Sequence, residues 1–280
     1  MSTYTVTDPS TGAEVELDAY TKEKDPERWK WRSISLAVVV AFLAIWELLP
    51  RLGLVSQIIL PPVTEVWLGL VELVQQDTFP GHLQVTLVEM LLGFLIGTLV
   101  GFSIGVALGV WESVKKSVYP LVVSFQSLPK IVLAPLLITW FGYGMESKIA
   151  MAVVIAFFPV LINTMVGLES VPDESRQLMR SLRASRGQIF RKLSLPHASP
   201  FIMAGIKTGL TFAVIGAIVG EFVGSSKGLG YLLHAYSFQL RIDKVFAVIV
   251  VLSAIGAILY FAIDWLERRM IYWRSDSTIT

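Results

Sequence analysis

Long apolar runs recur along the sequence, and they constrain the fold more than any other feature. A helix needs about 20 apolar residues to cross the hydrocarbon core of a bilayer. Such runs lie at residues 34–52, 86–110, 118–140, 149–169, 201–222 and 245–266. Charged residues make up only 16% of the chain, against roughly 25% in soluble domains. The sequence therefore predicts an all-α membrane protein with six transmembrane helices.

The third run differs from the others because it contains Pro120, Pro129 and Pro135 together with Lys130. Proline removes a backbone donor and clashes with the preceding helical turn. Irregular backbone at membrane depth is tolerated where it is buried in protein or lines a water-filled cavity. We expect this span to be kinked or broken.

The distribution of Lys and Arg predicts the orientation, because cytoplasmic segments of membrane proteins are enriched in both. With the N-terminus inside, most of the 23 basic residues fall on the cytoplasmic side, and Lys130 and Lys207 lie within spans. Those that fall outside are Arg51, Lys148, Lys227, Arg241 and Lys244. The expected organisation is a cytoplasmic tail over 1–33, a membrane domain over 34–268 with a cytoplasmic loop over 170–196, and a cytoplasmic tail over 269–280.

Two further patterns concern packing. After Pro62 an amphipathic helix is expected on the outer membrane surface, with Thr64 as a possible cap and Val66, Leu70 and Leu73 on one face. In the second run a glycine recurs at every fourth position from 93 to 109. Such a stripe allows close helix approach, and we expect packing within the subunit rather than a subunit contact or pore wall.

The stretch "RSLRASRGQIFRKLSLPHASP", residues 180–200, is strongly basic and contains no acidic residue. Ser170 to Asp173 and Ser185 to Gln188 both have the spacing of a helix capping box. Two apolar stripes follow these patterns: Leu178, Met179 and Leu182, then Ile189, Phe190 and Leu193. We expect two short amphipathic helices with a joint around residues 183–187, the second ending at Leu195-Pro196.

A plain basic loop that contacts anionic lipid headgroups would account for the charge of this stretch. It would not account for two capped apolar stripes in tandem, because apolar faces outside the membrane need a cover. The pattern therefore predicts that the stripes are covered, either by packing within a bundle of the loop's own or by a partner protein.

The order "ASRGQIFRKLSLPHASPFIMAGIKTGL" resembles the cytoplasmic loop of permease subunits of ATP-binding-cassette (ABC) importers, which carries the family's EAA motif. Aligned on Leu195-Pro196, Leu193 takes the family's Ile position and Arg183 its Gly position, while Gln177 stands at the position of the motif's Glu. The stretches "ILPPVTEVW", "SLPKIVLAPLLITWFGYGMESKI" and "GEFVGSSKGLGYLL" resemble the nitrate/sulfonate/taurine/bicarbonate branch.

The resemblance implies a type I importer permease in a prokaryotic inner membrane. It also implies a second permease copy, two ATPase subunits that bind ATP and Mg²⁺, and an external solute-binding protein. The loop residues that it implies for ATPase coupling are Leu178, Leu182, Arg183, Ala184, Ser185, Arg186, Gly187, Ile189, Phe190, Leu193, Leu195 and Pro196. The substrate would be a small anion such as a sulfonate, nitrate or carboxylate, although heterocyclic precursors use similar permeases.

Four polar residues are candidates for the translocation path. Lys130, with Gln126 and Ser127 beside it, could line a cavity for an anion, or its ammonium could reach back to the cytoplasmic interface. Glu221 ends the fifth run, where it could contact the opposite subunit or the gate, or bond to the glycine-rich turn that follows.

Other functional classes find less support in the sequence. The chain has no cysteine, its three histidines lack metal-ligand spacing, and it contains no G-x-x-x-x-G-K-[ST] phosphate loop. We therefore expect no metal, no cofactor and no nucleotide site in this chain, and no enzymatic activity. A net charge of +1 gives no reason to expect a nucleic-acid partner. An ATP-independent secondary transporter or channel remains the alternative, and it would not need the 170–196 loop.

Overall fold

The computed structural model describes residues 4–7, 14–17 and 28–271. The chain divides into two compact units, residues 1–57 and 58–280. In the first unit, β1 (Tyr4–Thr7) and β2 (Glu14–Leu17) form an antiparallel pair, and α1 spans Arg28–Arg51. The helix thus begins within the tail predicted over 1–33. The rest of that tail outside the two strands, and residues 272–280 of the C-terminal tail, lie outside the described residues.

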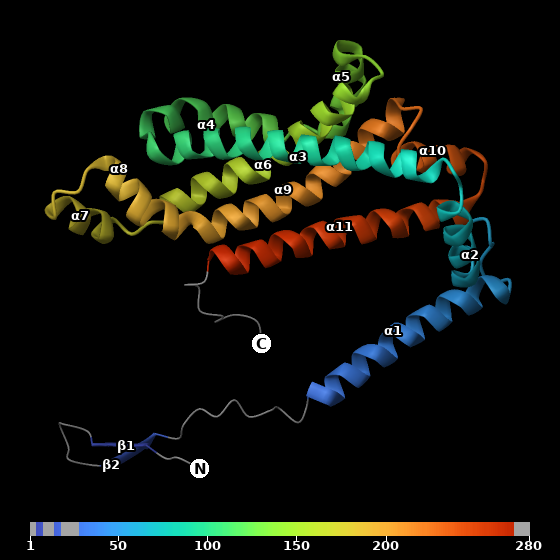
Figure 1. Ribbon diagram of the computed structural model, residues 1–280, viewed down its shortest axis with the longest axis horizontal. Helices are drawn as coiled ribbons and strands as arrows, with labels where there is room; N and C mark the ends of the chain where they lie inside the picture. The colour runs from blue at the N-terminus through green and yellow to red at the C-terminus, as the bar shows by residue number, and fades with distance from the viewer. Residues whose placement is uncertain (1–3, 8–13, 18–27, 272–280) are drawn as a thin grey trace. The chain divides into compact units, whose positions relative to one another are not determined.

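The second unit is helical, and Figure 1 shows its long helices running through it. Short elements gather at its two ends: α7 and α8 lie at one end, and α2 and α10 at the other (Figure 1). We call these the α7–α8 end and the α2–α10 end. The elements are α2 (Val63–Val74), α3 (Phe79–Val110), α4 (Glu112–Gln126), η1 (Lys130–Leu133), α5 (Ala134–Phe141), α6 (Met145–Glu169), α7 (Asp173–Ser181), α8 (Arg186–Ile189), η2 (Phe190–Ser194), α9 (Leu195–Gly224), α10 (Leu229–Phe238) and α11 (Ile242–Met270).

The helices confirm the six predicted spans. Part of α1, together with α3, α6, α9 and α11, is long and apolar enough to cross a membrane. The third span is broken: residues 112–126 and 130–141 meet at an angle of 88°. Pro129 lies at this break, where it cannot donate the hydrogen bond that would continue α4.

The core lies where α6 packs against both α3 and α9. The glycine stripe on α3 faces α6, and a Cβ at Gly101 would lie only 2.7 Å from the carbonyl oxygen of Phe157. A Cβ at Gly105 would lie at the same distance from the carbonyl oxygen of Leu161. The two backbones thus approach too closely for any side chain between them, and the prediction of packing within the subunit is confirmed.

The amphipathic helix predicted after Pro62 is present as α2. Val66 and Leu73 are buried and Leu70 is half-buried, so the predicted face is correct, and the helix packs against α11. The predicted Thr64 cap is wrong: Pro62 takes the N-cap position, which places Thr64 inside the first turn, and no side chain caps the helix.

Candidate functional site

The joint between α7 and α8 is closed by a Schellman motif, a left-handed turn that ends a helix. The Ala184 amide donates to the Met179 carbonyl at 3.0 Å, and the Arg183 amide donates to the Arg180 carbonyl at 2.9 Å. Arg183 has φ +56°, a conformation that glycine adopts without strain. Arg183 therefore makes the bend at the position where the family pattern has glycine.

Only one of the two predicted capping boxes forms. The Ser185 hydroxyl accepts from the Gln188 amide at 3.3 Å, and the Gln188 side chain accepts from the Ser185 amide at 2.7 Å. The box predicted at Ser170 is wrong, because that hydroxyl donates back to the Gly167 carbonyl at 2.9 Å. Pro172 takes the N-cap position of α7.

The predicted helix end at Leu195-Pro196 is also wrong. Residues 186–224 form one uninterrupted helical segment. A wide π-helical turn at Phe190–Ser194 comes directly before Pro196, which lies in the first turn of α9. The wide turn accommodates Pro196, which cannot donate a backbone hydrogen bond, and the chain continues into the fifth span without a break.

The two apolar stripes of this loop have different surroundings. Leu178 and Leu182 are 62% and 69% exposed, and α7 buries no residue. Phe190, by contrast, packs with Leu168 and Ala198 at the ends of α6 and α9. Leu178 and Leu182 of the first stripe are thus left uncovered while Met179 is half-buried, and the second stripe attaches the loop to the membrane helices.

The remaining predicted coupling residues divide in the same way. Those that are exposed are Arg183, Ser185, Arg186 and Gly187. Those that are half-buried are Ala184, Ile189, Leu193, Leu195 and Pro196. The exposed set surrounds the joint, which therefore projects beyond the helices that hold it.

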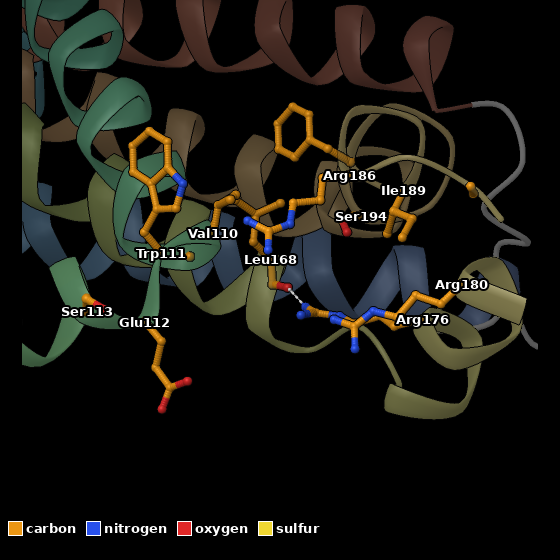
Figure 2. A pocket seen from close by; sticks show the side chains of 13 residues that line it. Val110, Trp111, Glu112, Ser113, Leu168, Arg176, Arg180, Arg186, Ile189 and Ser194 are labelled. Carbon is orange, nitrogen blue, oxygen red and sulfur yellow. Dashed lines mark hydrogen bonds between the residues drawn. The ribbon is translucent and has the colours of Figure 1, made fainter.

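A cavity of about 650 Å³ lies beside this joint. Figure 2 shows the side chains of Arg176, Arg180 and Arg186 among those that line it, together with Trp111 and Glu112. The Arg176 guanidinium donates to the Leu168 carbonyl at 2.6 Å. The cavity therefore combines three cations with an aromatic wall.

A second cavity, of about 530 Å³, opens beside the break in the third span. Gln126 and Lys130 line it, together with Phe158, Asn163 and Phe212. The Lys130 ammonium lies 5.0 Å from the centre of the Phe158 ring and donates to the Gln126 carbonyl at 3.0 Å. Two of the four candidate path residues thus meet in one cavity. Ser127 is exposed next to it, and its hydroxyl donates to the Val123 carbonyl.

The family of binding-protein-dependent transport system inner membrane components matches residues 93–272. The chain belongs to this family. It is a transmembrane permease subunit of an ABC importer, in which a partner subunit hydrolyses ATP.

Relatives with curated names agree with this assignment. A "Probable ABC transporter permease protein" of Haemophilus influenzae is 38% identical, over 85% of this chain and 96% of the relative. The formylaminopyrimidine transport permease protein ThiX of Halalkalibacterium halodurans is 34% identical, over 83% and 92%. The taurine transport system permease protein TauC of Escherichia coli is 27% identical, over 89% and 94%. The permease therefore belongs with the sulfonate and taurine branch.

A solved structure supports the fold. The inward-facing MetNI methionine ABC transporter aligns with a TM-score of 0.59, over 66% of this chain and 93% of the solved chain, at 24% identity. The permease thus has the type I ABC importer fold.

The fourth candidate path residue, Glu221, lies apart from Lys130, in a buried polar cluster at the α2–α10 end of the permease. Its carboxylate accepts from the Thr86 hydroxyl at 2.6 Å and from the Gly230 amide at 2.5 Å, and it contacts the carboxyl of Glu89. Thr86 in turn accepts from the Leu229 amide at 2.8 Å. Glu221 therefore bonds to the glycine-rich turn, one of the roles expected for it, and is only 1% exposed.

Lys148 completes this cluster, although its position in the sequence suggested an outside loop. The ammonium donates to the carbonyl oxygens of Tyr143, Gly144 and Gly224, at 2.6, 3.0 and 2.6 Å. It is 1% exposed and close enough to Glu89 and Glu221 to interact with both. Glu89 itself lies inside an apolar run, where an ionisable residue indicates a partner, and that signal could have revealed the cluster.

Lys207 also has partners that sequence reasoning missed. The sequence places this lysine within a span, and its ammonium forms ion pairs with Asp264 and Glu267 on α11. The two acidic residues lie one helical turn apart, so both face α9. Their spacing in the sequence could identify them as partners of Lys207 only if α9 and α11 were known to be neighbours.

Proposed function

We propose that this permease forms the translocation path for a small anionic solute that an external binding protein delivers. In this proposal two copies of the chain pair with two cytoplasmic ATPase subunits, which bind ATP and Mg²⁺. The loop over 170–196 docks into the ATPase, and both termini lie in the cytoplasm.

The uncovered stripe on α7 is the observation that carries the coupling role. Leu178 and Leu182 are exposed on a helix outside the spans, next to a joint held by its own hydrogen bonds. Fully burying one leucine contributes about 1.5–3 kcal/mol. A partner protein that covers this stripe would therefore gain substantial affinity from it.

Support for an anionic solute comes from Lys130, which places an ammonium at the wall of the second cavity. The taurine permease among the relatives fits this class.

The same cavity is lined by Phe158 and Phe212, and a formylaminopyrimidine permease is also a relative. A flat heterocycle is thus the second candidate. Measuring which solute stimulates ATP turnover of the assembled transporter distinguishes the two.

Replacing Leu178 with Glu tests the coupling role. The new carboxylate would have to be desolvated in the interface, so binding of the ATPase should weaken at least tenfold. Gln177→Glu is the matched control, because it adds the same charge to the same helix at the position where the family motif has Glu. Ala184 is a poorer target, since it lines the arginine cavity, where a carboxylate would find cations.

Co-purification with the ATPase and ATP turnover are the measurements, after gel filtration has shown that both variants remain monodisperse. If the Leu178→Glu variant binds the ATPase as tightly as the Gln177→Glu variant does, the proposed docking surface is contradicted.

Labelling of single cysteines tests the orientation, because the chain has no cysteine of its own. Gln75 and Gly187 are both exposed, one at each end of the second unit. A membrane-impermeant thiol reagent applied to intact cells should label Gln75→Cys and leave Gly187→Cys unlabelled. The reverse pattern would overturn the orientation and the coupling role with it.

A further inference from the structure

The arginines of the cavity beside the joint have hydrogen-bonding capacity that the chain does not use. In the part of the chain that the structure describes, Arg176, Arg180 and Arg186 form no ion pair with an acidic side chain. The buried Arg176 Nε has no hydrogen-bond partner there either. Glu112 lines the same cavity, but its carboxylate pairs with Lys116 at 2.9 Å. These donors are therefore available to an anion from outside the chain.

Guanidinium groups suit one kind of anion in particular. Their planar donors match the oxygens of a phosphate in a bidentate arrangement. The cavity, at about 650 Å³, falls in the size range of small-molecule sites. A phosphate with a substituent attached would therefore fit in both chemistry and size.

The walls of the cavity indicate what that substituent is. Trp111, Val110, Leu168, Ile189 and Phe190 contribute apolar surface next to the arginines. A free phosphate or a sugar phosphate would leave these apolar side chains exposed to water, whereas an amphiphile would cover them. The ligand should therefore carry both a phosphate and an apolar part.

The place of the cavity in the fold narrows the choice further. It is formed where α3 and α6 end and α4 begins, at the ends of membrane-spanning helices. Tryptophan is enriched at this depth, where lipid headgroups lie, and Trp111 is 58% exposed. In the orientation proposed above this is the cytoplasmic leaflet, whose surface carries anionic lipids.

We propose that the cavity lined by Arg176, Arg180, Arg186 and Trp111 binds the phosphate headgroup of an anionic phospholipid. The arginines hold the phosphate, and the apolar walls contact the start of the acyl chains. The lipid then fills the space between the membrane helices and the α7–α8 joint. This goes beyond the ATPase contact, which we assign to the exposed Leu178 and Leu182 on α7.

Lipid binding by the purified full-length permease in detergent tests this proposal without the ATPase. Native mass spectrometry would measure the apparent Kd for dioctanoyl phosphatidylglycerol, dioctanoyl phosphatidylcholine and glycerol 1-phosphate. The wild-type protein should bind phosphatidylglycerol at least tenfold more tightly than either of the other two. The double variant Arg180→Gln/Arg186→Gln should lose at least tenfold in affinity for phosphatidylglycerol.

The matched control is Arg191→Gln/Lys192→Gln, which removes two positive charges from the same segment at exposed positions outside the cavity. It should retain wild-type affinity within twofold. Equal losses in both double variants would overturn the proposal, because the charge would then act as a diffuse basic surface. No loss in the first variant, or glycerol 1-phosphate binding as tight as that of the lipid, would overturn it as well.

A second variant, Trp111→Ser, keeps the proposal testable if Arg180→Gln/Arg186→Gln fails to fold. Trp111→Ser leaves all three arginines in place and removes one apolar wall, so it should weaken phosphatidylglycerol binding and leave glycerol 1-phosphate binding unchanged. Unchanged lipid binding in Trp111→Ser would contradict the assigned apolar contact. Since the assay contains no ATPase, failure of the docking surface at Leu178 leaves these results unaffected.

Discussion

The two ends of the second unit treat their charged groups in opposite ways. At the α2–α10 end, Glu89, Lys148 and Glu221 are each 1% exposed, and the Lys148 ammonium donates to three carbonyl oxygens. At the α7–α8 end, Arg180 and Arg186 are exposed and have no acidic partner among the described residues. One end therefore keeps these charged groups buried within the chain, while the other presents them outward.

The difference shows how each end can contribute to transport. A buried charge that loses its partner is costly, so the cluster at the α2–α10 end ties α3, α6, α9 and the turn before α10 to one another. An exposed cation costs little to leave unpaired and is available to a ligand. We therefore expect substitutions at the first end to affect folding, and those at the second to affect binding.

Lys148→Met should have the largest effect. It removes the cation that interacts with Glu89 and Glu221, and with it the hydrogen bonds to three carbonyl oxygens. Removing one partner from a buried ionic group costs about 3–5 kcal/mol, so the free energy of unfolding in detergent should fall by about that amount. Lys227→Met, an exposed lysine near the same end, is the control and should unfold like the wild-type protein. Similar losses in both variants would remove the basis for the contrast between buried and exposed charge.

Thr86→Val should have an intermediate effect, because the Thr86 hydroxyl donates to Glu221 and accepts from the Leu229 amide. Leaving buried polar groups without a partner costs about 1–3 kcal/mol. Thr98→Val on the same helix is the matched control, since the Thr98 hydroxyl is buried and has no hydrogen-bond partner among the described residues. Denaturing both variants in the same detergent gives the difference between their free energies of unfolding. Equal stability would mean that the Thr86 network does not hold the turn before α10.

Arg180→Gln should have the smallest effect on folding. The side chain is exposed and takes part in no ion pair within the described part of the chain, so its loss removes no interaction within the protein. The unfolding midpoint in lipid-free detergent should stay at the wild-type value. A loss of stability approaching that of Lys148→Met would show that the arginines stabilise the loop itself. Charged groups would then contribute to folding at both ends of the second unit.

Much of the fold could be predicted from local patterns. The apolar runs identify the spans because each helix must be apolar over about 20 residues whatever its neighbours are. The three prolines of the third run predict a kink or break there, and Ser185 with Gln188 predicts the cap of α8, since both effects act within a few residues. The glycine stripe also predicts a close contact, although not which helix makes it.

Predictions that depended on competing local bonds were less successful. Ser170 has the spacing of a cap, but its hydroxyl bonds back to the Gly167 carbonyl, which is equally close in sequence. Pro196 has the form of a helix end, yet the π-helical turn before it lets the helix continue. In each case the residue type allows two outcomes, and the packing of the loop on α6 and α9 selects one.

By itself, the sequence determined that this chain crosses a membrane several times, that its third span is kinked or broken, and that a basic loop with apolar stripes lies outside the spans. Only the tertiary structure decided that Glu89, Lys148 and Glu221 share one buried cluster, and that Arg176, Arg180 and Arg186 surround one cavity. Membrane insertion depends on the composition of each segment alone. The partner of a charged side chain depends on which helices become neighbours, and that is set by how α3, α6 and α9 pack together.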